Sequence, residues 1–196
     1  LRETQMNKIC LIILMHQLIF QAMFGIKNTI LMKKAGKQIR GNNAEANIFV
    51  LFFVLFMIVT FVFSFQIVQF GQVKFLNSFH STIAGLVLLG FNLAISTASL
   101  IDLKDSWRVG VIENQKTVLI TSGIYRFSRN PYFVSYLLML LAYTVLLQNL
   151  ILLGLSIMGF IFTNRMIKKE ETYLYSVHGE VYTQYKKKVP RYIISA

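Results

Sequence analysis

Four long stretches without a charged side chain constrain this chain more than any other feature of its sequence. They cover residues 9–26, 47–73, 75–101 and 130–164. A helix needs about 20 apolar residues to cross the hydrocarbon core of a bilayer, so each of the first three stretches fits one crossing. The fourth stretch would extend roughly 50 Å as a single helix, well beyond a core of roughly 30 Å. The sequence therefore predicts an all-α integral membrane protein with a single domain, residues 1–196.

The fourth stretch is predicted to form a helical hairpin. Gln148 and Asn149 interrupt it near its middle and leave apolar arms at residues 133–147 and 150–163. With one crossing from each of the first three stretches, the hairpin brings the total to five transmembrane helices. A loop ahead of the hairpin and a C-terminal helical tail behind it complete the motif-bearing half of the chain, residues 102–196.

Positive charge orients the five predicted helices. The chain carries 20 Lys and Arg against 8 Asp and Glu, and in membrane proteins such an excess marks cytoplasmic segments. Most of the basic residues fall into three segments: Lys27, Lys33, Lys34, Lys37 and Arg40; Lys104, Arg108, Lys116, Arg126 and Arg129; and Arg165, Lys168, Lys169, Lys186, Lys187, Lys188 and Arg191. With three crossings in residues 1–101 and the N-terminus outside, all three segments face the cytoplasm, whereas Lys74 and the hairpin tip lie outside. The expected partner of this charge is the membrane surface rather than nucleic acid.

Metal and disulfide chemistry find little support in the sequence. Cys10 is the single cysteine, so no intramolecular disulfide can form. The three histidines, His16, His80 and His178, do not have the spacing of metal ligands. No two glycines are separated by a single residue, so the Gly-rich phosphate-binding turn of Rossmann folds is also absent from the sequence. We therefore expect no metal site.

Two polar segments flank the predicted hairpin and contain an ordered set of motifs. Residues 116–132 contain Gly-x-Tyr and Arg-Asn-Pro-Tyr, and residues 169–191 contain Glu-Glu, Gly-x-x-Tyr-x-x-Tyr and Val-Pro-Arg. The residues that form the set are Gly123, Tyr125, Arg129, Pro131, Glu170, Glu171, Gly179, Tyr182, Tyr185, Val189, Pro190 and Arg191. In this order around a short hydrophobic hairpin, they resemble the isoprenylcysteine carboxyl methyltransferase family, whose pattern is shared by related phospholipid methyltransferases. Asn130 departs from the resemblance, because the family usually has a histidine there.

The resemblance implies S-adenosylmethionine as the cofactor, bound in a pocket that faces the cytoplasm. Carried over residue by residue, the cofactor-binding positions are Thr117, Val118, Leu119, Ile120, Tyr125, Asn130, Pro131, Tyr132, Phe133 and Glu170. The chemistry of these side chains agrees with that implication. The Glu170 carboxylate can pair with the amino group of the cofactor, and the aromatic face of Tyr125 can attract its sulfonium cation.

The catalytic residues depend on the methyl acceptor. Methyl transfer requires alignment and exclusion of water more than acid–base groups. A carboxylate acceptor needs a cation to hold it, for which Arg129 and Arg165 are candidates, and an amine acceptor needs a base such as Glu171. The family's acceptor-binding arginine aligns with Met166, which makes Arg165 a shifted substitute.

The resemblance predicts S-adenosylmethionine-dependent methyl transfer to a lipid-borne acceptor, such as an isoprenylcysteine carboxylate. A phospholipid amine is the alternative acceptor. The alternative from another class is a non-catalytic membrane protein that binds or transports a ligand. Ionisable residues gather at one end of the predicted bundle rather than in both halves of its helices, which favours the enzyme over a transporter.

Overall fold

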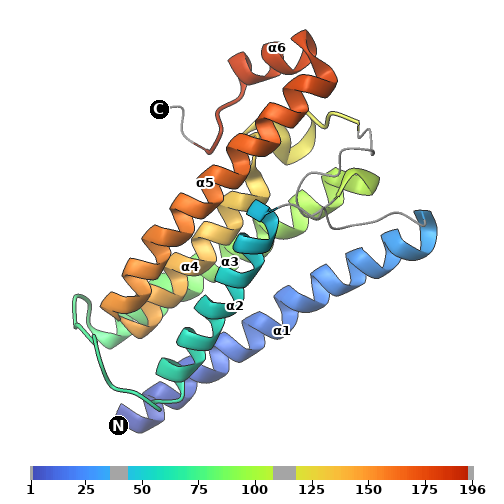
Figure 1. The fold of residues 1–196 in the computed structure, drawn as a ribbon. Coiled ribbons are helices and arrows are strands. Elements are labelled where there is room, and N and C mark those ends of the chain that lie inside the picture. The colour runs from blue at the N-terminus through green and yellow to red at the C-terminus, as the bar shows by residue number, and fades with distance from the viewer. Residues whose placement is uncertain (1, 36–43, 108–117, 194–196) are drawn as a thin grey trace.

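Helices make up the fold, as the sequence predicted. The computed structural model describes residues 2–35, 44–107 and 118–193, and no strand forms within these ranges. The helices are α1 (Arg2–Ala35), α2 (Ala44–Ser64), α3 (Ser78–Leu103), α4 (Pro131–Leu147), α5 (Leu150–His178) and α6 (Glu180–Lys188), with short 3₁₀ turns η1 (Lys104–Ser106) and η2 (Gly123–Arg126). Five long helices form an elongated bundle, and α6 lies across one end of it (Figure 1).

Four helical segments are long and apolar enough to cross a membrane. They are Asn7–Lys33 within α1, Ala44–Ser64, Ser78–Ser106 and Leu150–His178. The sequence predicted five crossings, and the difference lies in α4, an apolar helix of 17 residues. At 1.5 Å per residue, α4 extends roughly 26 Å against a hydrocarbon core of roughly 30 Å. The structure thus has the helices of a multi-pass membrane protein.

The helix that follows the turn at residues 148–149 is longer than the sequence analysis expected. The returning arm was predicted to end near Thr163, but α5 continues to His178. Polar residues replace apolar ones after residue 163, yet neither glycine nor proline interrupts the chain until Gly179. Gly179 has a φ of 53°, a left-handed backbone angle that favours glycine, and the helix ends there. The predicted tail is therefore largely a continuation of α5.

The polar residues of α1 connect this helix to the interior of the bundle. The His16 Nδ1 atom lies 2.7 Å from the Tyr143 hydroxyl group, and its Nε2 atom lies 2.9 Å from the Asn92 Oδ1 atom. Because that amide oxygen can only accept, Nε2 carries the proton and the Tyr143 hydroxyl donates to Nδ1. Gln17 also donates to the Tyr143 hydroxyl at 2.6 Å. Polar groups are costly inside a bilayer, and here they pair across α1, α3 and α4.

Close packing fixes α4 between its neighbours. A Cβ atom added at Gly85 in α3 would lie 2.4 Å from the Leu146 side chain in α4. A Cβ atom added at Gly159 in α5 would lie 2.4 Å from Leu140 and 2.9 Å from Phe52. Small residues at these two positions let the helix backbones approach closely. These contacts hold α4 against α3 and α5 in the half of the bundle that lies away from α6.

Asn149 caps the N-terminal end of α5, which is the end away from α6. Its Oδ1 atom accepts from the backbone N–H groups of Ile151 and Leu152 at 2.9 and 3.3 Å, and its Nδ2 atom donates to the Phe70 carbonyl at 2.7 Å. We expect Asn149→Ala to lower the free energy of unfolding by about 1–2 kcal/mol, because this buried cap is lost. Thermal unfolding of the detergent-purified protein measures the change. Asn149→Ser keeps a capping acceptor without adding a buried charge and is expected to lose less; an equal loss in both variants would contradict the capping role.

Candidate functional site

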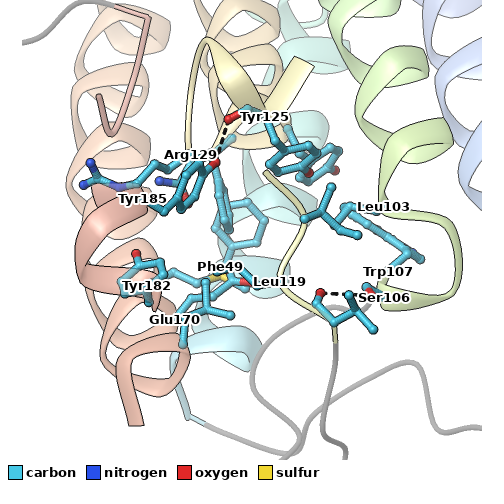
Figure 2. A pocket seen from close by; sticks show the side chains of 17 residues that line it. Phe49, Leu103, Ser106, Trp107, Leu119, Tyr125, Arg129, Glu170, Tyr182 and Tyr185 are labelled. Atoms are coloured by element: carbon cyan, nitrogen blue, oxygen red, sulfur yellow. Dashed lines mark hydrogen bonds between the residues drawn. The ribbon is translucent and has the colours of Figure 1, made fainter. Parts of the chain in front are cut away.

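A pocket opens at the end of the bundle next to α6 (Figure 2). Its cavity measures about 120 Å³, whereas a single water needs roughly 10–15 Å³ on the same measure. Side chains from α2, the α3–η1 junction, residues 118–120, η2, α4, α5 and α6 line it. They are Phe49, Leu103, Ser106, Trp107, Val118, Leu119, Ile120, Tyr125, Arg129, Asn130, Tyr132, Phe133, Met166, Glu170, Leu174, Tyr182 and Tyr185. Segments far apart in sequence thus converge on one cavity.

Most of the residues that the sequence analysis assigned to the site border this pocket. They are Val118, Leu119, Ile120, Tyr125, Arg129, Asn130, Tyr132, Phe133 and Glu170. Pro131 is buried at the start of α4 and is not in the lining. Glu171 is also buried outside the lining, and Arg165 is exposed. Thr117 lies outside the described residues, as do the predicted loop cations Arg108 and Lys116.

Some pocket residues were missed by the sequence analysis. Tyr182 and Tyr185 were named only as members of a motif and not as site residues, but both are buried in the pocket wall. Their spacing of three residues places them on the same face of α6, a signal that pointed to a shared surface. Phe49 and Trp107 also line the cavity. Nothing in the sequence around Phe49 distinguishes it from the other aromatic residues of α2.

Tyr125 is held in place from both sides. The Asp102 Oδ2 atom accepts from the backbone N–H of Ile124 at 2.7 Å, and the Tyr185 hydroxyl donates to the Tyr125 carbonyl at 2.6 Å. Gly123, which begins this turn, has a φ of 61°, in the left-handed region. Burial raises the pKa of the Tyr125 phenol well above its usual range, so the ring is neutral at physiological pH. The turn therefore presents a fixed, uncharged aromatic wall to the pocket.

Glu171 is the centre of a buried ion-pair cluster behind the pocket. Its Oε1 atom lies 2.7 Å from the Arg129 Nη2 atom, and its Oε2 atom lies 2.6 Å from the Arg191 Nη2 atom. The Arg129 and Glu171 side chains are 7% and 8% exposed. The hydrogen bond to Glu171 raises the pKa of the Arg191 guanidinium, which is already charged at every physiological pH. Both oxygens of Glu171 are thus engaged by cations.

The same cluster fastens the chain after α6 to the loop before α4. Arg129 donates from Nη1 to the Val189 carbonyl at 2.5 Å and from its backbone N–H to the Pro190 carbonyl at 2.9 Å. The Ser128 hydroxyl and the Asn130 side-chain amide both donate to the Arg191 carbonyl at 3.2 Å. Asn130, which stands where the resemblance expects histidine, is therefore a backbone tether in this chain. These bonds hold α6, and with it Tyr182 and Tyr185, against the pocket.

The fold and this pocket together define a multi-pass helical membrane protein with an aromatic, acid-containing ligand pocket at one end of its bundle. Comparison with known proteins identifies the family. Residues 83–176 match the model of the isoprenylcysteine carboxyl methyltransferase family. The matched segment contains η2, α4 and nearly all of α5, and so most of the pocket lining. This matched segment, just under half of the chain, belongs to the family.

The chain is also similar to individual proteins, two of which carry the family's name. A protein-S-isoprenylcysteine O-methyltransferase of Schizosaccharomyces pombe is 34% identical over 120 residues, which cover 60% of this chain and 51% of that protein. One of Xenopus laevis is 30% identical over 113 residues, which cover 56% of this chain and 39% of that protein. An uncharacterized protein of Haemophilus influenzae is 44% identical over 62 residues, 31% of this chain and 98% of that protein. The chain spans about half the length, or less, of the two named methyltransferases.

Proposed function

We propose that this chain transfers a methyl group from S-adenosylmethionine to the carboxylate of an isoprenylcysteine embedded in the membrane. The observation that carries the proposal is the pocket itself, which gathers the family's motif residues, from Val118 to Glu170, into one cavity at the end of an apolar bundle. A cavity at that position is open to a polar cofactor and lies next to the helices that contact lipid. The activity named for the two relatives supports the same reaction class.

The pocket residues suit the cofactor. Glu170 supplies a carboxylate for the ammonium group, and the Tyr125 ring supplies a neutral aromatic face for the sulfonium. The backbone of residues 118–120 supplies donors and acceptors for the adenine edge. When bound, S-adenosylmethionine provides an already activated methyl carbon. The protein's own task is then to align the two reactants and to exclude water, which the buried rings of Tyr125, Phe133 and Trp107 do.

The ion-pair cluster holds parts of the pocket wall in place rather than contacting the reactants. Arg129 borders the pocket, but its guanidinium is held by Glu171 and by the Val189 carbonyl. Glu171 is engaged by two arginines and does not border the pocket. We therefore assign Arg129 and Glu171 as positioning residues that hold the tail over the cavity. Arg165 is exposed on α5, whereas its neighbour Met166 lines the pocket and adds to its apolar surface.

The pocket end of the bundle faces the cytoplasm in this proposal, with α4 as the fifth crossing. Exposed basic residues near that end support the orientation: Lys104, Arg126, Lys168, Lys169, Lys186, Lys187 and Lys188. The connection between α2 and α3, at the opposite end, carries Lys74. Basic residues are enriched on the cytoplasmic side of membrane proteins. A cofactor from the cytoplasm and an acceptor from the bilayer would then reach the same cavity.

The experiment that tests the reaction follows a radiolabelled methyl group from S-adenosylmethionine with protein reconstituted in vesicles. One set of vesicles contains an S-farnesylated N-acetylcysteine, and a matched set contains phosphatidylethanolamine instead. Base-labile incorporation into the farnesylated acceptor alone is expected, because a methyl ester is hydrolysed by base. Incorporation into phosphatidylethanolamine alone would contradict the carboxylate acceptor. Incorporation into neither, by protein that is folded, would contradict the function.

Glu170 tests the cofactor part of the proposal. We expect Glu170→Gln to raise the dissociation constant for S-adenosylhomocysteine roughly tenfold, because an ion pair to the ammonium group is replaced by a neutral contact. Isothermal titration calorimetry of the detergent-purified protein measures this constant. Glu180→Gln is the matched control, since that exposed carboxylate lies on α6 outside the pocket lining. An unchanged affinity in Glu170→Gln would show that the pocket is placed wrongly.

A further inference from the structure

Tyr182 is a buried phenol in the pocket wall with an unpaired hydroxyl group. The residue is 2% exposed and lines the cavity. Within the described part of the chain, its hydroxyl has no hydrogen-bond partner. Leaving such a group buried and unpaired destabilises the protein unless a ligand supplies the partner. An unpaired polar group that borders a ligand cavity points to a group on the ligand as its partner.

The contrast with Tyr185 sharpens this point. Both residues lie on the same face of α6, and both line the pocket. The Tyr185 hydroxyl is occupied, because it donates to the Tyr125 carbonyl at 2.6 Å. Tyr185 therefore has a structural task, and Tyr182, one helical turn before it, does not share that task. The Tyr182 hydroxyl can therefore bind a ligand, whereas the Tyr185 hydroxyl is engaged by the protein backbone.

The surroundings of Tyr182 favour donation to an anion. Burial, followed by the charge of Glu171, raises the pKa of the Tyr182 phenol to about 12, so it keeps its proton at neutral pH. Arg129, the cation whose charge acts on this phenol, carries only hydrogen-bond donors. The phenol proton is thus directed to an acceptor other than that guanidinium. A phenol that keeps its proton can donate a hydrogen bond to a carboxylate.

We propose that Tyr182 donates a hydrogen bond to the α-carboxylate of the S-adenosylmethionine amino-acid group, while Glu170 holds the ammonium on the same carbon. This inference rests on the proposed function. Tyr182 and Glu170 both line the pocket, where Figure 2 labels them, and the charge of Glu170 acts on the Tyr182 phenol. Tyr182 belongs to the Gly-x-x-Tyr-x-x-Tyr motif, which lies beyond the residues that match the family model, 83–176. It would add α6 to the cofactor site.

The test compares Tyr182→Phe with the unmodified protein and uses two ligands. One ligand is S-adenosylhomocysteine, and the other is its decarboxylated analogue, which keeps the amine. We expect Tyr182→Phe to raise the dissociation constant for S-adenosylhomocysteine roughly tenfold, because one hydrogen bond to a charged group is lost. The decarboxylated analogue should bind both proteins equally. Calorimetry in detergent gives all four constants without reference to turnover.

Tyr185→Phe is the matched control. It removes a hydroxyl that supports the Tyr125 backbone, so it should weaken both ligands by the same factor. Two results would overturn the inference: an equal loss for both ligands in Tyr182→Phe, or no loss for S-adenosylhomocysteine. If the unmodified protein binds neither ligand, the proposed function fails together with this inference. Binding of S-adenosylhomocysteine that is insensitive to Tyr182→Phe leaves the function intact and removes only the role of Tyr182.

Discussion

Glu171→Gln is expected to lower the free energy of unfolding by about 3 kcal/mol, because removal of one partner from a buried ion pair leaves uncompensated charge. Arg129, only 7% exposed, and Arg191, 29% exposed, both lose their carboxylate partner. The tail that these arginines hold should also loosen, which weakens binding of S-adenosylhomocysteine. Thermal unfolding and calorimetry on the same detergent preparation measure the two effects.

An exposed ion pair provides the matched control for Glu171. Glu45 and Lys169 form a salt bridge between α2 and α5 with side chains that are 38% and 43% exposed. Glu45→Gln makes the same chemical change as Glu171→Gln, but water screens that pair, so no measurable loss is expected. If Glu171→Gln is as stable as the unmodified protein, the cluster does not hold the tail and our assignment of Glu171 is wrong.

Gly123→Ala is expected to weaken the binding of S-adenosylhomocysteine roughly a hundredfold, through strain and a steric clash. An alanine Cβ atom at this position would lie 2.0 Å from the Asp102 Oδ2 atom and 2.4 Å from its Cγ atom. The glycine also has a φ of 61°, which L side chains rarely adopt. Either cause moves the turn that carries Tyr125, and with it one wall of the pocket.

Two further variants separate the clash from a general effect on stability. Gly90→Ala is the control, because no atom lies within 4 Å of an added Cβ there, and it should bind as the unmodified protein does. In the double variant with Asp102→Ala, the Gly123→Ala substitution should cost less than it costs alone, because the clashing carboxylate is gone. Full loss in both backgrounds would show that the backbone angle at Gly123, and not the clash with Asp102, causes the loss, and normal affinity in Gly123→Ala would contradict the placement of Tyr125.

The helices could be predicted because their signal is local. Uncharged stretches and the polar pair at residues 148–149 placed the helices and the turn between α4 and α5 close to where the structure has them. The extent of α5 was less accessible. Many of its residues after Thr163 are polar, and we predicted from this change that the transmembrane arm ends there. The helix continues, however, and ends only where Gly179 permits a left-handed backbone.

The direction of side chains on α5 explains the partial success at the site. Successive residues of a helix are about 100° apart, so neighbours face different surroundings. Glu170 and Met166, four residues apart, both line the pocket, whereas Glu171 turns toward the arginine cluster and Arg165 turns outward. The resemblance supplied Glu170 and residues 118–120. A shift of one position, from Met166 to Arg165, placed the predicted cation on the wrong face of the helix to reach this cavity.

The contribution of α6 depends on contacts between distant parts of the chain. Tyr182 reaches the pocket because Gly179 turns the chain and because Arg129 and Arg191 meet at Glu171. These partners are separated by 20 and 42 residues from Glu171. No short sequence motif indicates that these two arginines contact Glu171. The spacing of the two tyrosines is compatible with one shared face of α6, but it does not indicate which part of the protein that face contacts.

Calorimetric titration of the unmodified, detergent-purified protein with S-adenosylhomocysteine tests the central claim most directly. We expect saturable binding at one site with a micromolar dissociation constant. Glu170→Gln should weaken this binding, and Glu180→Gln should leave it unchanged. Absence of binding, in a preparation whose cooperative thermal transition shows that it is folded, would contradict the claim that this pocket holds a methyl donor.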